Sequence, residues 1–319
     1  MHFRTELIVP ESPDKITLQT PVLTLGSCFA EVIGSKLVEN KIPILSNPFG
    51  TLFNPLSIVK LLHHAVEGTP PDERLYIEHQ GIWLHYDFHS SLWGTSKKEL
   101  HERLVATLTA VQQWLSRTEV LIITLGTAFV YRHLESGQWV ANCHKTPSSA
   151  FRRELLSTEQ IVAAFEGLFA KLPASIKVIF TVSPVRHTRD TLPINAVSKS
   201  VLRVACHELS ELGYAYFPAY ELLLDDLRDY RFYKSDLIHP NEQAEDYIFE
   251  QFANAYFTKE LQKFIQEWQK IRQALQHRPL YPSTPNHRQF LENLLQKLHK
   301  ISTSIDAKVE ITQVQQQLS

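Results

Sequence analysis

Short runs of apolar and β-branched residues recur along the first two thirds of the chain. Uninterrupted runs of this kind are typical of strands that are buried on both faces of a parallel sheet. The clearest runs are "VLTL" (22–25), "VLIITLG" (120–126) and "KVIFTVS" (177–183), with "IPIL" (42–45) and "YAYF" (214–217) as weaker examples.

Helical patterns lie between these runs. In residues 28–40, the side chains of Phe29, Val32, Ile33 and Leu37 fall on one face of a helix. Similar stripes span 96–116, 157–172 and 194–212. Strands that alternate with helices predict an α/β fold with a doubly wound parallel sheet. In such a sheet, ligand sites form beyond the carboxyl ends of the strands.

Two stretches break the alternation and read as hairpins. The first covers 75–91 and turns near Gln80-Gly81, and the second covers 128–145 and turns at Glu135-Ser136-Gly137. We expect both to be insertions over one end of the sheet.

The strand pattern stops after about residue 240. Residues 245–278 predict one long helix or two, a turn follows at 279–286, and a further amphipathic helix runs to about Ser302. The last residues, "VQQQLS", are expected to fray. We therefore expect a main domain over 1–255 and a helical extension over 256–319, whose apolar stripe either packs internally or mediates self-association.

The amino-acid composition of the chain does not favour nucleic acids or membranes as partners. The chain has 319 residues, is 44% hydrophobic and carries a formal net charge of −2, so no excess of positive charge favours nucleic acid or an anionic membrane. No apolar run approaches the roughly 20 residues of a membrane span. The N-terminus lacks the apolar core of a signal peptide. The three cysteines, Cys28, Cys143 and Cys206, show no metal or disulfide spacing, which favours a cytoplasmic protein.

Ser27 follows the first strand run, at the start of the first helix pattern, in "VLTLGSCFAE". One interpretation is a helix cap, in which the serine hydroxyl accepts a hydrogen bond from the first turn. The other is a nucleophile, since the helix N-terminus supplies free N–H groups and a positive dipole beside the hydroxyl. Gly26 keeps the turn free of a side chain.

A base for that nucleophile occurs far along the chain, in "KSDLIHPNEQ". Asp236 precedes His239 by three residues, so its carboxylate can reach the Nδ1–H of the ring and leave Nε2 free to take a proton. Pro240 suits the first turn of a following helix. The alternative is a helix start that carries an Asp and a His by chance.

These segments resemble the GSCFA domain family, whose relatives are the SGNH (GDSL-type) hydrolases. "LGSCFAE" is similar to the signature of that family, and "SNPFGTLFNP", "ITLGTAFVYR", "VANCHKTP", "TVSPVRHTRD" and the segment ending in "SDLIHP" are similar to its other segments in the same order, over about 20–255. The resemblance implies a three-layer α/β/α sandwich of the SGNH type with a central parallel sheet of about five strands. It also implies ester hydrolysis or acyl transfer through a Ser-His-Asp triad.

By this resemblance, Ser27 is the nucleophile, His239 the base and Asp236 the carboxylate. The backbone N–H groups of Ser27 and Gly50 match donors of the oxyanion hole. The asparagine that normally supplies a further donor is missing, because "LGTAFV" (125–130) has none. Loss of one such donor typically costs about 10²–10³ in kcat.

Asn142 is the candidate substitute, since it can return to the site from the second hairpin. His144 lies two residues on and would face the same way on a strand. Thr127 follows a strand end and is a lesser candidate for substrate binding.

Arg186 and His187 follow the strand run 177–183, where loops line the pocket of this architecture. Arg186 could hold a substrate carboxylate or phosphate with two hydrogen bonds. The alternative is an ion pair with a surface acid such as Asp190.

Cys28 is the alternative nucleophile, although it would point about 100° away from Ser27 on a helix. A buried, structural thiol is its other interpretation. His85, Asp87 and His89 could share one face of a strand, but they would span about 13 Å, too far for one metal ion. We therefore predict no metal and no cofactor, and we place His89 near the rim of the cleft as a substrate-binding residue.

Two functions follow as hypotheses. The first is a serine-dependent esterase, deacetylase or O-acyltransferase that acts on a small-molecule or glycan ester. The second is an SGNH-fold binding protein with weak or no catalysis, because a fold does not by itself give a function.

Overall fold

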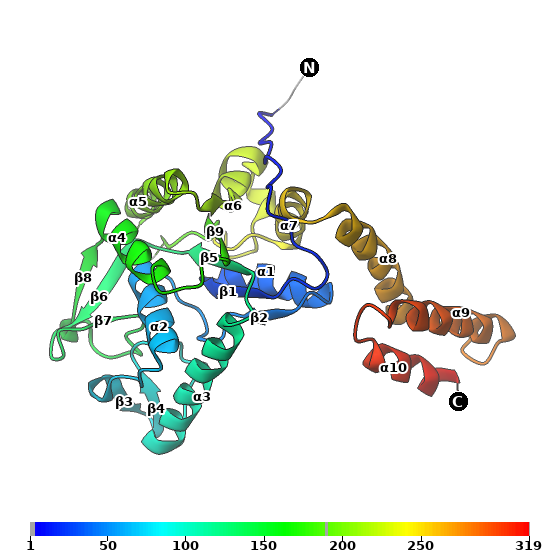
Figure 1. Cartoon of the computed structure of the whole chain (residues 1–319), viewed down its shortest axis with the longest axis horizontal. Helices are drawn as coiled ribbons and strands as arrows, with labels where there is room; N and C mark the ends of the chain where they lie inside the picture. The colour runs from blue at the N-terminus through cyan, green and yellow to red at the C-terminus, as the bar shows by residue number, and fades with distance from the viewer. Residues whose placement is uncertain (1–3, 189–190, 319) are drawn as a thin grey trace.

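The computed structural model describes residues 4–188 and 191–318 (Figure 1). Within these residues, a parallel sheet of five strands forms the centre, in the order β10-β9-β5-β1-β2. The strands are β1 (Val22–Gly26), β2 (Ile44–Ser46), β5 (Val120–Leu125), β9 (Lys177–Val182) and β10 (Ala215–Tyr216). The five apolar runs in the sequence therefore correctly predicted the central sheet.

Helices cover both faces of this sheet (Figure 1). On one face, alternate strand residues such as Leu23 and Leu121 pack against α2 (Pro55–Glu67), α3 (Lys97–Leu115), α4 (Thr158–Phe169) and α5 (Leu192–Glu211). On the other face, Val22 and Ile122 pack against α1 (Cys28–Glu39) and α7 (Glu242–Tyr256). A short helix, α6 (Ala219–Glu221), continues into a π-helical turn over Leu222–Leu227. The mixed α/β fold is confirmed.

Both predicted hairpins form. Strands β3 (Tyr76–His79) and β4 (Ile82–His85) pair through a turn in which Gln80 and Gly81 have positive φ, as a two-residue hairpin turn requires. Strands β6 (Phe129–His133) and β7 (Trp139–Val140) form the second, and β8 (Phe151–Leu155) joins its other edge.

One expectation about the first hairpin is wrong. Strand β4 ends at His85, so His85, Asp87 and His89 do not share the face of a single strand. Each binds its own neighbour: His85 contacts the carbonyl of Asp72, and Asp87 pairs with Lys60 at 2.7 Å.

The C-terminal helices are α8 (Lys259–Gln276), α9 (Pro285–Ile301) and α10 (Lys308–Leu318), which extend to one side of the sandwich (Figure 1). Helix α10 continues to Leu318, and its Val314 is buried against α8 and α9. The last residue of the segment expected to fray, Ser319, lies outside the described residues. Trp268 ties α8 to the main body, since its indole N–H donates to the carbonyl of Glu39 at 2.7 Å. In the described part of the chain, no helix is both long and apolar enough to cross a membrane.

The strand order determines where a site can form. Strand β1 lies between β2 and β5, so the chain leaves β1 toward one edge and later returns to its other side. In open α/β sheets, the crevice at such a reversal, beyond the carboxyl ends of the strands, is the usual ligand position. Residues Gly26 to Cys28 emerge from β1 at this point.

Candidate functional site

The chain makes a sharp turn at Gly26, between β1 and α1. Gly26 has φ +134°, and an added Cβ would lie 2.1 Å from the carbonyl oxygen of Thr124 on β5. The N–H of Gly26 donates to Oδ1 of Asn47, and the N–H of Ser27 donates to the Thr124 carbonyl at 3.0 Å. Two neighbouring segments therefore hold the turn in place, and only glycine fits it.

Ser27 occupies the cap position of α1, but its side chain does not cap the helix. Ser27 is completely buried, and its hydroxyl has no hydrogen-bond partner among the described residues. The capping interpretation is therefore wrong for this side chain. Leaving a buried hydroxyl unpaired typically costs about 1–3 kcal/mol.

Asp236 and His239 form the expected pair in the loop before α7. Oδ2 of Asp236 lies 2.8 Å from Nδ1 of His239. Oδ1 accepts from the backbone N–H groups of Ile238 and His239. These backbone donors, with the ring of His239, lower the pKa of Asp236 to about 2. The carboxylate therefore stays ionised and holds the ring with Nε2 directed away from it.

His239 borders a cavity of about 600 Å³ at the N-terminal end of α1. Cys28, Glu31 and Val185 also line this cavity. Ser27 is not among the residues that line this cavity, and in the described structure no hydrogen bond joins Ser27 to His239. The expectation that Ser27 would face the histidine is therefore not met, and the neighbouring thiol shares the cavity with His239.

The surroundings of Cys28 act on its ionisation in opposite directions. Burial and the nearby carboxylate of Glu31 raise the pKa of the thiol. Lys199 and the backbone N–H groups of Cys28 and Phe29 lower it, but by less, so the pKa lies above its ordinary value. The thiol is accordingly neutral near pH 7 and needs a base in order to attack.

Lys199 lies beneath the site and is completely buried. Its Nζ donates to the carbonyls of Gly126 and Ser183, at 2.8 and 2.7 Å, and so joins the carboxyl ends of β5 and β9. Burial lowers its pKa to about 7. Sequence reasoning missed this residue, although a signal exists: Lys199 falls on the core-facing stripe of α5, in line with Leu202 and Cys206.

His187 is half-buried near this lysine. Its backbone N–H donates to Oδ1 of Asn195, and Nε2 has no partner among the described residues. Burial, with Lys199 and His239 nearby, lowers the pKa of His187 to about 4. His187 is therefore a neutral ring at the inner side of the site.

The donors expected in the oxyanion hole already have acceptors. The N–H of Ser27 binds Thr124, and the N–H of Gly50 donates to the carbonyl of Asn47 at 2.8 Å. The side-chain amide of Asn142 donates to the carbonyl of Phe88 at 2.9 Å. All three N–H donors are thus used within the turn or the hairpin. The first N–H groups of α1 are the donors that the structure offers for an oxyanion instead.

The sequence matches the model of the GSCFA family over residues 21–252, well over half of the chain. The protein belongs to the GSCFA family. A second model, described as the C-terminal domain of GSCFA domain proteins, matches residues 268–319. No curated protein matches the chain. In this GSCFA protein, the main family match includes the turn at Gly26 and the Asp236–His239 pair.

The remaining predicted residues of the GSCFA protein have other neighbours. Thr127 contacts the hydroxyl of Ser198 at 2.9 Å, and Nε2 of His144 contacts the carbonyl of His85 at 2.8 Å. His89 contacts the hydroxyl of Ser91 at 3.0 Å. All three positions stabilise loops and hairpins rather than line the cavity beside His239.

Arg186 lines a different cavity, of about 340 Å³, where its guanidinium lies 4.3 Å from the ring centre of Tyr233. Its backbone N–H donates to the carbonyl of Ile238, which anchors the loop that carries His239. The alternative partner for Arg186, Asp190, lies outside the described residues. Across residues 4–188 and 191–318, no group of three His, Cys, Asp or Glu side chains could hold a metal ion.

Proposed function

We propose that this GSCFA protein transfers acyl groups from esters, with a nucleophile at the N-terminus of α1 and the Asp236–His239 pair as its base. The observation that carries the proposal is the cavity that Cys28 and His239 share. An SGNH-like arrangement of the fold is part of the proposal, supported by the five-stranded sheet and by the position of the pair after the last strand.

The structure favours Cys28 as the attacking group. As Nε2 of His239 takes the thiol proton, the sulfur bonds to the ester carbonyl carbon and a tetrahedral oxyanion forms. The proton then passes to the leaving alkoxide, and a thioester remains on Cys28. Water or an acceptor hydroxyl attacks the thioester with His239 again as base, which releases the acid or the new ester and restores the thiol.

The helix N-terminus can stabilise the oxyanion. The N–H groups of Cys28 and Phe29 face the thiol, and the positive end of the dipole of α1 lies beside them. Asp236 stabilises the imidazolium that forms on His239 during each transfer.

Ser27 is the second candidate, because its buried hydroxyl has no structural partner in the described residues. Attack by Ser27 requires the loop of His239 to move inward, since the hydroxyl is not exposed. A binding protein that uses the same cavity without catalysis is the alternative to both.

The test is hydrolysis of short-chain aryl esters by the wild type and by Cys28→Ala, Ser27→Ala and His239→Ala, with the acyl-enzyme detected by intact mass. We expect Cys28→Ala and His239→Ala to lose activity by several orders of magnitude and Ser27→Ala to retain it. Loss in Ser27→Ala alone would transfer the role to the serine. A wild type that forms no acyl-enzyme and hydrolyses no ester would favour the binding protein.

A further inference from the structure

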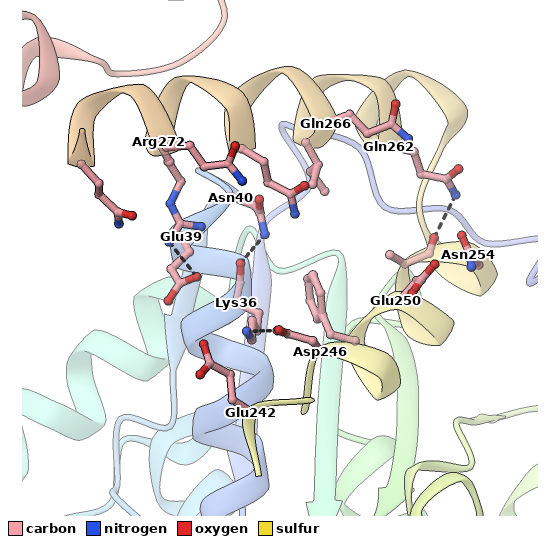
Figure 2. Close-up of a pocket in the computed structure, with 16 residues that line it drawn as sticks. Lys36, Glu39, Asn40, Glu242, Asp246, Glu250, Asn254, Gln262, Gln266 and Arg272 are labelled. Atoms are coloured by element: carbon pink, nitrogen blue, oxygen red, sulfur yellow. Dashed lines mark hydrogen bonds and ion pairs between the residues drawn. The ribbon is translucent and has the colours of Figure 1, made fainter. Parts of the chain in front are cut away.

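A polar groove of about 660 Å³ runs between α8 and the helices α1 and α7 (Figure 2). Lys36, Glu39 and Asn40 of α1 form one wall, and Asp246, Glu250 and Asn254 of α7 contribute to another (Figure 2). Phe249 and Ile265 provide a small, nearly buried apolar floor.

The groove wall that α8 contributes is rich in glutamine. Helix α8 directs its apolar side chains, such as Ile265 and Trp268, into the protein. Among its charged residues, Arg272 lines the groove, whereas Lys263, Glu267 and Lys270 are exposed and do not line it. The groove wall carries five glutamines, spaced four and three residues apart: Gln262, Gln266, Gln269, Gln273 and Gln276.

The concentration of amides in this wall has a chemical consequence. A solvated helix face ordinarily carries charged residues, whereas an amide offers both donors and an acceptor without charge. The five glutamines extend over about 21 Å at 1.5 Å per residue. The amide of Gln262 already donates to the carbonyl of Ala253 at 3.0 Å. The other four amides can form hydrogen bonds with a neutral ligand of several units that also presents donors and acceptors.

Ion pairs hold the rest of the groove in shape. Lys36 pairs with Asp246, and Arg272 pairs with Glu39 at 3.0 Å (Figure 2). Lys36 and Arg272 are the two cationic residues of the lining. Its four acidic residues are Glu39, Glu242, Asp246 and Glu250, so the formal charge of the lining is −2. This charge disfavours phosphates, uronic acids and nucleic acid.

The groove continues into the cavity of His239. Lys36, Glu39 and Glu242 line both spaces. A chain-like ligand that lies along α8 can therefore reach the cavity that Cys28 and His239 line.

We propose that this groove binds a neutral oligosaccharide, with sugar hydroxyls on the amides of α8 and the C–H face of a ring on Phe249 and Ile265. Its further role, to present an O-acylated unit of that oligosaccharide to His239, rests on the proposed function. Binding itself does not depend on catalysis.

The test is calorimetric titration of the full chain with neutral hexasaccharides, namely cellohexaose, xylohexaose, maltohexaose and chitohexaose. Glucose tests the need for length, hexagalacturonate tests negative charge and hexalysine tests positive charge. The groove variant carries Gln266→Ala, Gln269→Ala and Gln273→Ala, all at exposed positions. The matched control carries Lys263→Ala, Glu267→Ala and Lys270→Ala on the solvent face of the same helix.

We expect at least one neutral hexasaccharide to bind more tightly than glucose. The groove variant should weaken it at least tenfold, and the control should not. Binding of hexalysine or hexagalacturonate alone, no binding by any hexasaccharide, or equal loss in both variants would overturn the proposal. Aryl-ester hydrolysis is measured on the same proteins: binding without hydrolysis would refute the proposed chemistry alone, and hydrolysis without binding would refute the groove alone.

Discussion

Asp236 and His239 form a closed unit, in which one carboxylate oxygen holds Nδ1 of the ring at 2.8 Å and the other accepts two backbone N–H groups. The loop therefore orients the histidine without help from another element. The tautomer of the His239 ring is therefore determined before a ligand enters the cavity, and Nε2 is available for proton transfer.

Replacement of the carboxylate tests this orientation. We expect Asp236→Asn to lower kcat by about 10²–10⁴-fold with little change in KM, because the amide favours the wrong tautomer. Since the pKa of Asp236 is about 2, its ionisation does not contribute to any rate loss in the weakly acidic range. A steady-state pH–rate profile checks both points. Asp229→Asn, at an exposed carboxylate nearby in the chain, is the control, and equal losses in the two variants would contradict the assigned role.

The pKa of the Cys28 thiol should lie above that of a free cysteine. Burial and Glu31 raise its pKa, so alkylation by iodoacetamide should increase with pH and reach half its maximum above the ordinary thiol value. Glu31→Gln should move the midpoint lower, because the Glu31 carboxylate raises this pKa. Peptide-resolved mass spectrometry separates Cys28 from the buried Cys206. A midpoint below that of free cysteine would contradict this account of the site.

The buried lysine should make stability depend on pH. Its pKa is about 7 in the folded protein, below the ordinary value of 10.5. Between these values the unfolded chain binds the proton and the folded protein does not, so the free energy of unfolding should rise with pH across this window. Below the window both states bind the proton, and this contribution becomes constant.

Lys199→Met should remove that rise. Urea unfolding at several pH values between 7 and 10, on wild type and variant, measures the difference in slope. Lys263→Met, at an exposed position of α8, is the control and should keep the wild-type slope. Parallel pH profiles for wild type and Lys199→Met would contradict the prediction.

Gly26 should tolerate no side chain. Gly26→Ala combines an unfavourable φ of +134° with a Cβ 2.1 Å from a backbone oxygen, so we expect a loss of about 3 kcal/mol or more. Gly137→Ala is the matched control, because Gly137 also has positive φ but no heavy atom within 4 Å of its added Cβ. It should cost only about 1–2 kcal/mol. Chemical denaturation compares the two, and equal losses would show that the contact with Thr124 can relax.

Part of the candidate site could be predicted from local sequence. Asp236 and His239 are three residues apart in one loop, and short-range geometry alone brings them together. Gly26 follows a buried strand and precedes a helix, which is enough to place it at a turn. The long helices were predictable because their apolar residues recur with the helical period, and the five strands because they are short apolar runs.

The choice between Ser27 and Cys28 was not predictable in this way. Their positions differ by one residue, and which side chain meets the cavity depends on how the turn is held by Thr124 and Asn47, which come from other segments. The donors Gly50 and Asn142 were misassigned for a similar reason, since their amides bind local carbonyls that no motif reveals.

The amino-acid sequence by itself determined the α/β class, the turn after the first strand and the aspartate–histidine pair, because each depends on neighbours within a few residues. Tertiary structure alone decided that Cys28 rather than Ser27 lines the cavity of His239, that a lysine is buried near Cys28, and that the glutamines of α8 face α1 and α7. Some of those relations join segments more than two hundred residues apart, and only the packing of helices on the sheet brings such segments together.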